Sequence, residues 1–288
     1  MTIQNTKDHR MASSNSIDEL LQLRFDDAPQ DVPGDTDTSH WQSIANHQSC
    51  RLYEDKPVHP DLVQQLCALA LGSPTKSDLQ QRDIIIVSDP DKRATINALF
   101  PDSPWIEGAP VFLVFCGNNR RLRQIHERHG HPFENDHLDA FFNAAVDAGI
   151  ALSAFALAAD AAGLGTCPIS TIRDHLATIN ELLDLPDWVF PVAGMTLGWP
   201  TRTPRINLRL PLAATVHTDT YNEVAQWDAI EAYDARRAEL RPYGSQRDPD
   251  RFGTRDPYTW SEDKARQYAK PQRTDFGAYI RAKGFKLD

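Results

Sequence analysis

The sequence has few cysteines and an excess of negative charge. Its four cysteines contain no Cys-x-x-Cys pair; they are Cys50, Cys67, Cys116 and Cys167. This scarcity argues against a disulfide framework or a cysteine zinc site, and it favours reduced thiols that fill small apolar spaces. The 30 basic and 40 acidic residues give a net charge of −10, which argues against a nucleic-acid surface.

Long apolar runs are also missing. No stretch approaches the roughly 20 consecutive apolar residues that a membrane span needs, and the N-terminus has no basic segment followed by an apolar run. We therefore expect a cytoplasmic protein without a membrane partner. The composition, 41% hydrophobic and 24% charged, is that of an ordinary globular protein.

The patterning divides the chain into three parts. Residues 1–40 are polar and are expected to be disordered, apart from a short amphipathic helix at Ile17–Leu23. Residues 41–215 alternate strand and helix patterns and form the expected ligand-binding domain. Residues 216–288 form a charged C-terminal arm or lid with one helix at Trp227–Leu240.

The predicted domain contains short β-branched runs between amphipathic or apolar segments. Strands are predicted at Asp83–Ser88, Val111–Cys116, Thr166–Ile169 and Val189–Trp199. Helices are predicted from Pro60 to about Gly72, over Leu138–Ala162, and over Asp174–Leu183. The helix over Leu138–Ala162 is apolar on nearly all sides, so it belongs in a core or a subunit interface.

Two polar segments of this domain predict a site for a small anion. The first is the run His47-Gln48-Ser49-Cys50-Arg51, and the second is the loop from Ser73 to Gln80 that follows a predicted helix. Basic and hydroxyl side chains donate charge-assisted hydrogen bonds to phosphate. In an acidic chain, such a cluster favours a phosphorylated small ligand such as riboflavin phosphate.

With these segments, several others resemble the FMN-dependent nitroreductase family, and most closely its oxygen-insensitive NADPH nitroreductase and NADPH:flavin reductase branch. The further matching segments are Gly163-Leu164-Gly165, Gly194 to Pro200, Arg209-Leu210-Pro211, His217 and Tyr221, Trp260-Ser261, and Lys283-Gly284-Phe285. The resemblance runs from about His47 to the C-terminus. It implies an α+β, nitroreductase-like fold: a mostly antiparallel sheet flanked by helices, in a homodimer.

The resemblance implies FMN as the cofactor, with NADPH or NADH as the electron donor. The residues that it assigns to FMN are His47, Gln48, Ser49, Arg51, Pro74, Thr75, Lys76, Gln80, Ile169, Ser170, Thr171 and Arg209. Arg241, Arg247 and Arg251, with Arg255, are candidates for binding the NAD(P)H phosphate. The chemistry belongs to the flavin, so no protein nucleophile is expected, and Arg51 and Lys76 would give electrostatic support.

The implied activity is ping-pong reduction of nitroaromatics, quinones or free flavins. Three positions depart from the branch: Gln48 replaces an arginine, Asn207 replaces a lysine, and Pro168 changes the segment beside the flavin. These departures keep two alternatives open. One is a specialised FMN reaction, such as dehalogenation or oxidation of a biosynthetic intermediate, and the other is a non-catalytic flavin- or metal-binding module.

A histidine-rich segment is the strongest candidate for a metal site. His126, His129 and His131 are followed by Glu134, Asp136 and His137. A zincin helix needs two histidines four residues apart, whereas His126 and His129 are three apart and Gly130 and Pro132 interrupt any helix. The segment is therefore predicted to be a solvated loop that holds no metal.

Overall fold

The computed structural model describes residues 16–29, 36–202 and 205–288 of the chain. These residues form two compact units: one from the described parts of 16–46 and 206–270, and one from the described parts of 47–205 and 271–288. The second unit contains the sheet and most of the predicted site. Both units combine segments from distant parts of the chain, so their boundaries differ from the three consecutive parts that the sequence suggests, and that division stays a prediction.

The sheet has four strands in the order β1-β2-β4-β3, and every neighbouring pair is antiparallel. This arrangement confirms the predicted α+β fold with an antiparallel sheet. The strands are β1 (Arg82–Ile86), β2 (Val111–Asn118), β3 (Gly165–Ile169) and β4 (Val189–Gly198). Each predicted strand is present, and no end is shifted by more than two residues.

The two prolines of the sheet lie where they cost few hydrogen bonds. Pro168 is in β3, an edge strand that pairs only with β4. Pro191 lies in the part of β4 that precedes its pairing with β3, next to a register shift in β2 between Phe115 and Cys116. Proline lacks a backbone donor and is therefore confined to edges and bulges.

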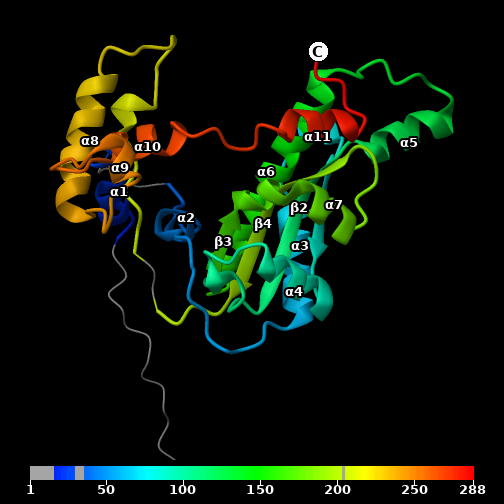
Figure 1. The fold of residues 1–288 in the computed structure, drawn as a ribbon, viewed down its shortest axis with the longest axis horizontal. Helices are drawn as coiled ribbons and strands as arrows, with labels where there is room; N and C mark the ends of the chain where they lie inside the picture. Colours follow the sequence, from blue (N-terminus) through cyan, green and yellow to red (C-terminus); the bar gives the residue numbers. More distant parts are fainter. Residues whose placement is uncertain (1–15, 30–35, 203–204) are drawn as a thin grey trace, which may run out of the picture. The chain divides into compact units, whose positions relative to one another are not determined.

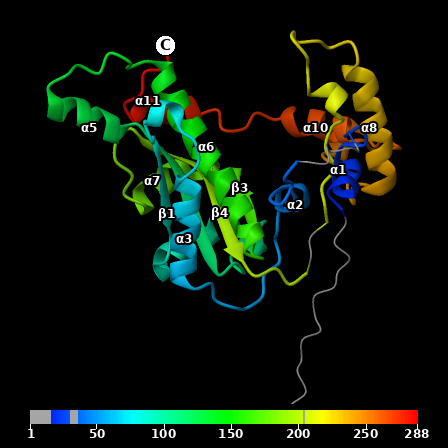
Figure 2. The same ribbon diagram turned by 180° about the vertical axis from the view of Figure 1, so that it is seen from behind.

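Helices α3 (Pro60–Leu71) and α6 (Leu138–Ala161) pack against one face of the sheet (Figures 1 and 2). Leu113 and Phe115 of β2 point into this layer and meet Phe155 of α6. Length and composition alone would let α6 cross a membrane. Its fully buried alanines and Phe155 instead make it the core helix of the second unit.

The opposite face of the sheet is covered by α4 (Pro90–Ala98), the 3-10 helix η3 (Ser170–His175) and α7 (Leu176–Leu182). Phe112 and Val114 alternate with Leu113 and Phe115 along β2 and pack into this second layer. Because both faces of β2 are buried, its sequence is a continuous apolar run.

The helix predicted over Asp174–Leu183 is present as the end of η3, which is 3-10, followed by the α-helix α7.

The remaining elements of the second unit connect these layers. They are η1 (Lys76–Asp78), η2 (Pro104–Ile106), α5 (Arg120–His129) and α11 (Phe276–Ala282). The prediction of a solvated loop was wrong for the first half of the histidine-rich segment. His126 and His129 lie on α5, which ends at Gly130 in the left-handed conformation that glycine favours.

The first unit is helical. It contains α1 (Ile17–Phe25), α2 (Trp41–Asn46), η4 (Leu212–Ala214), α8 (Gln226–Leu240), α9 (Pro249–Phe252) and α10 (Trp260–Tyr268). The predicted N-terminal helix is present, with a capping box between Ser16 and Glu19. Residues 1–15 and 30–35 of the segment predicted to be disordered lie outside the described residues. The predicted C-terminal arm, with one helix expected at Trp227–Leu240, also contains the helices α9 and α10.

Candidate functional site

The run from His47 to Arg51 lies beside the edge strand β3. Ser49 forms an isolated parallel bridge with Thr166, and the Cys50 amide donates to the Thr166 carbonyl at 2.7 Å. A Cβ atom on Gly165 would lie 2.5 Å from the Cβ of Cys50. Only glycine at position 165 lets the run approach this closely, so the Gly163-Leu164-Gly165 motif has a packing role here.

His47 is fixed to the end of α6. Its Nδ1 atom lies 2.5 Å from Oδ2 of Asp160, and both side chains are mostly buried. The neighbouring Gln48 is also buried, at 8% exposure. The run therefore has a defined position on the sheet and on α6.

Arg51 is the exposed cation of this run. Its guanidinium lies over the ring of Trp105, 5.5 Å from the ring centroid, and is also near the Cys167 thiol. Among the described residues no carboxylate forms an ion pair with Arg51. In a chain of net charge −10, a guanidinium held against an aromatic ring and away from carboxylates is available to an anionic ligand.

The second predicted segment is anchored by Asp147, a carboxylate of α6 that is 1% exposed. Its two oxygens accept the backbone amides of Lys76 at 3.1 Å and Gln81 at 3.0 Å. The buried Arg82 donates to the carbonyls of Leu71, Ser73 and Pro74 at 2.7 to 3.0 Å. Two charged groups thus fix the loop between α3 and β1 through its backbone.

The backbone of this loop is strained. Ser77, Asp78 and Gln80 all have positive φ angles, of 47°, 57° and 52°. Non-glycine residues in this region cost about 1–3 kcal/mol each and cluster at ligand clamps and active sites. The strain agrees with a role for the loop in ligand binding.

The side chains of this loop are partly or fully exposed and contact one another or α6. The Lys76 Nζ atom donates to Asp139 at 2.8 Å, which with a hydrogen bond from Asn143 lowers the pKa of Asp139. Gln80 Nε2 donates to Asp78 at 3.0 Å, and the Gln80 amide lies 3.4 Å from the Thr75 hydroxyl. Pro74 is exposed.

The third predicted segment continues from β3 into η3. Ser170 and Thr171 are exposed at the start of η3, whereas Ile169 is 4% exposed and packs into the core. Ile169 can therefore offer a ligand only its backbone. Pro168 presents its ring to solvent on the edge strand.

The predicted segments are not adjacent. Asp147 holds the loop and Asp160 holds His47, and at 1.5 Å per residue these two anchors are about 20 Å apart along α6. A phosphate group alone cannot reach both segments. An elongated ligand with an anionic end could extend from one segment toward the other.

The remaining predicted residues belong to the first compact unit. Arg209 is exposed there, and its amide donates to the carbonyl of Arg24 at 2.7 Å. Arg247 contacts Asp263 at 3.0 Å, and Arg241 donates to the carbonyl of Leu240 at 2.9 Å. Arg251 is exposed and lies over the ring of Phe252. The cofactor roles of these arginines stay predictions.

Sequence reasoning missed the supporting residues Asp147, Asp160 and Trp105. The two aspartates had a signal, because each interrupts an otherwise apolar helix. An acidic residue at a buried helical position needs a partner, and here the partners are the two predicted segments. The packing of Trp105 against Arg51 had no counterpart in the sequence pattern.

The histidine-rich segment forms no metal centre in the described part of the chain, where no three His, Cys, Asp or Glu residues are grouped to hold an ion. His126 instead lies 3.0 Å from the Pro132 carbonyl and packs edge-on against Phe133. Asp136 pairs with Arg123 and Lys286.

The four cysteines, all within the described residues, are buried, and none forms a disulfide.

Solved structures define the class of protein. The structure of NfrA2 from B. megaterium superimposes with a TM-score of 0.78, at 33% sequence identity, over 86% of this chain and 98% of that one. The antiparallel sheet and the helices on its two faces thus form a fold that this chain shares with a solved structure.

Sequence comparisons identify the family. Residues 44–199 match the nitroreductase family, and residues 208–288 match the C-terminal domain of the same family. An FMN reductase [NAD(P)H] of Bacillus subtilis is 33% identical over 86% of this chain and 98% of its own length. An oxygen-insensitive NADPH nitroreductase of Salmonella typhimurium is 29% identical over 84% and 96%. The chain belongs to the nitroreductase family.

Proposed function

We propose that this protein is an FMN-dependent NAD(P)H oxidoreductase that reduces nitroaromatics, quinones or free flavins. The observation that carries the proposal is the run His47–Arg51, fixed to β3 and α6 with an exposed guanidinium that has no carboxylate partner among the described residues. The FMN reductase and nitroreductase relatives, which match nearly their whole length, support the same assignment.

The residues present fit FMN. A phosphate needs charge-assisted donors, which His47, Ser49 and Arg51 can supply at the β3 end of α6. The ribityl chain and ring need neutral donors and apolar contacts, which Thr75, Gln80 and Pro74 can supply at the Asp147 end. Bound FMN would supply the redox chemistry, accepting hydride from a nicotinamide and passing electrons to the second substrate.

The residues of the chain itself would bind FMN and orient it. The Asp160 contact would hold the His47 ring in place, and the Asp147 contacts would hold the amides of the second segment. Arg51 and Lys76 would stabilise negative charge electrostatically. No protein residue is assigned to a covalent step.

Among the arginines proposed to bind NAD(P)H, the surroundings favour Arg251. Arg247 already contacts the buried carboxylate of Asp263. Arg251 forms no ion pair in the described part of the chain and is exposed beside Phe252. It can therefore receive the additional phosphate of NADPH at no cost to an existing pair.

We further propose that the protein is a homodimer in the cytoplasm. Leu138, Phe142 and Val146 lie at four-residue spacing along α6 and are 49%, 59% and 42% exposed. Leu69 of the neighbouring helix α3 is 64% exposed. Large apolar side chains that are contiguous and exposed mark interaction surfaces, and a second copy would cover this one.

The test is the visible spectrum of the purified protein, followed by separate additions of NADPH and NADH without oxygen. We expect flavin absorption that bleaches on addition of the preferred donor and returns when a nitroaromatic or quinone is added. A colourless protein that FMN cannot reconstitute would overturn the proposal. If the protein contains flavin that neither coenzyme bleaches, the result would favour a non-catalytic flavin-binding module.

A specialised FMN reaction is a second candidate because of the departures at Gln48, Pro168 and Asn207. Gln48 is buried in the phosphate-binding run, and the Pro168 ring occupies the edge of β3 just before Ser170. Both positions adjoin the proposed flavin residues. Turnover on a panel of acceptors separates the candidates: nitroaromatics, quinones and free flavins favour the first, and failure on all of them after bleaching favours the second.

A further inference from the structure

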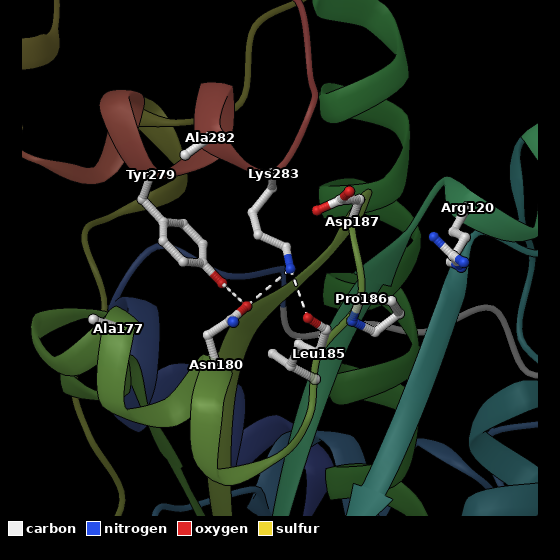
Figure 3. A pocket seen from close by; sticks show the side chains of 9 residues that line it. All are labelled: Arg120, Ala177, Asn180, Leu185, Pro186, Asp187, Tyr279, Ala282 and Lys283. Carbon is white, nitrogen blue, oxygen red and sulfur yellow. Dashed lines mark hydrogen bonds between the residues drawn. The ribbon is translucent and has the colours of Figure 1, made fainter.

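A separate cavity of about 620 Å³ opens in the second unit, at the end of the sheet where β2 meets α5 (Figure 3). Small-molecule sites typically have volumes of about 300–1,000 Å³. None of the residues assigned to FMN lines it. The lining residues are Arg120, Ala177, Asn180, Leu185, Pro186, Asp187, Tyr279, Ala282 and Lys283.

A buried lysine, Lys283, is one of the residues that line the cavity. Lys283 is 6% exposed, and its Nζ atom donates to Asn180 Oδ1 at 2.9 Å and to the Leu185 carbonyl at 2.7 Å. The Tyr279 hydroxyl donates to the same Asn180 oxygen at 3.1 Å. All of these acceptors are neutral, so the lysine charge is hydrogen-bonded but not neutralised, and burial lowers the pKa of Lys283.

Two further charges line the cavity without partners of their own. Arg120 begins α5, and its guanidinium forms no hydrogen bond or ion pair in the described part of the chain. The Asp187 carboxylate also forms no ion pair there. Its negative charge raises the pKa of Lys283, whereas the positive charge of Arg120 lowers it. In Figure 3, Arg120 and Asp187 lie on one side of Lys283, and Tyr279 and Asn180 lie on the other.

A purely structural role explains only part of this arrangement. Lys283, Tyr279 and Asn180 tie α11 to α7, and that tie accounts for their hydrogen bonds. It does not account for Arg120 and Asp187, which make none of these hydrogen bonds. Two cations and one carboxylate leave a net charge of +1 around a cavity in a protein of net charge −10.

We propose that this cavity binds a small organic monocarboxylate with an apolar body. The guanidinium of Arg120 matches the geometry of a carboxylate, and the N-terminus of α5 adds favourable potential. A monoanion balances the net charge of the wall, whereas a dianion would be repelled by Asp187. The apolar body would lie against the exposed side chains of Ala177, Pro186 and Ala282.

Benzoate is a suitable probe, measured by isothermal titration calorimetry on the full FMN-loaded chain. We expect saturable binding that Arg120→Gln weakens by about tenfold or more, because a charge-assisted contact is lost. Arg128→Gln, an exposed arginine on the same helix that does not line the cavity, is the matched control and should leave the affinity unchanged. Neutral benzamide should not bind.

Three results would overturn the proposal: no saturable binding tighter than about 1 mM, equal affinity in Arg120→Gln and Arg128→Gln, or competition by NADPH that places benzoate at the flavin. Lys283→Met tests the second cation and should also weaken binding. The inference is independent of the proposed function, because Arg120→Gln should leave flavin bleaching by NADPH unchanged. If the chain lacks flavin, the same titration remains interpretable.

Discussion

Arg51 and Arg247 are both exposed arginines in an acidic chain, yet their surroundings differ. Arg51 lies over Trp105 with no carboxylate partner in the described residues, whereas Arg247 is 3.0 Å from Asp263. The first can bind an anionic ligand without breaking an ion pair. The second fixes α10 and would lose that contact on binding a ligand.

Replacing Arg51 should weaken FMN retention. Arg51→Ala removes charge-assisted hydrogen bonds, each of which contributes about 1.5–3 kcal/mol, so we expect the Kd for FMN to rise by about tenfold or more. Fluorescence titration of the apoprotein with FMN measures this change. Arg128→Ala is the control and should bind FMN like the unmodified chain. An Arg51→Ala protein with full flavin and unchanged turnover would disprove this role.

The buried carboxylate of Asp263 should contribute to the free energy of unfolding in a pH-dependent way, which a single substitution can test. Burial raises its pKa, but hydrogen bonds from Lys264 and Tyr258 and the charges of Lys264 and Arg247 outweigh burial, so the folded pKa is lowered. A lowered folded pKa stabilises the fold above the unfolded value of about 3.9. This stabilisation is lost as the pH falls through the folded pKa.

We therefore expect Asp263→Asn to lower the free energy of unfolding by about 1–2 kcal/mol at pH 7, a value discounted because Lys264 and Arg247 are partly exposed. Urea unfolding at a series of pH values should show the gap between the two proteins shrinking below about pH 4. Asp250→Asn, which removes an exposed carboxylate of α9, should show no gap. A gap that does not vary with pH would exclude the ion-pair explanation.

At the scale of elements, α6 positions the site as well as filling the core. Its apolar faces pack against the sheet and α3, while Asp147 and Asp160 hold the two polar segments. One rigid helix thus sets the distance between them. The strained loop persists because the buried Asp147 and Arg82 fix its backbone at several points.

Removing the Asp147 anchor should loosen this loop. Asp147→Ala leaves the amides of Lys76 and Gln81 without their acceptor, so we expect a loss of about 3 kcal/mol in the free energy of unfolding and weaker FMN binding. Asp147→Asn keeps one acceptor oxygen and should lose less. Urea unfolding and FMN titration measure both effects.

Asp139→Ala on the same helix is the matched control. The Asp139 side chain is 45% exposed and contacts side chains of the loop and of α6, so its loss should lower the free energy of unfolding much less than the loss of Asp147. Equal costs for Asp139→Ala and Asp147→Ala would show that the backbone contacts are not what holds the loop.

At the scale of the molecule, the exposed apolar stripe of α6 is the main reason to expect a second copy. A helix whose inner face builds the core normally shows solvent a polar outer face, yet Leu138, Phe142 and Val146 are exposed. Covering these side chains by a partner would remove them from water. The monomer fold alone gives them no role.

A charge at the centre of this stripe should break the dimer. Phe142→Glu would bury a carboxylate in an apolar interface, so we expect a monomer where the unmodified chain is a dimer in sedimentation velocity. Ala278→Glu, at an exposed position on α11, should stay dimeric. A Phe142→Glu protein that sediments as a dimer would place the interface elsewhere, and a monomeric unmodified chain would exclude the dimer.

Much of the fold was predictable because the signals are local. Local patterns predicted all four strands, and they predicted the start of α3 at Pro60 and the end of α6 at Ala162 to within one residue. The prediction of a loop over the histidine-rich segment is wrong before Gly130 because a glycine in the left-handed conformation ends a helix without excluding one before it. The 3-10 geometry of η3 had no signal in the periodicity.

The resemblance to a known family implied the antiparallel α+β fold, and the sequence alone predicted the strands, the main helices, and the basic and hydroxyl segments of the candidate site. These features depend on residue type, order and short-range periodicity, which a sequence records directly. Only the tertiary structure decided that Asp147 and Asp160 anchor those segments, that Arg51 lies over Trp105, and that Lys283, Arg120 and Asp187 line one cavity. Such contacts join residues far apart in the chain, and their geometry exists only once the helices and the sheet have packed.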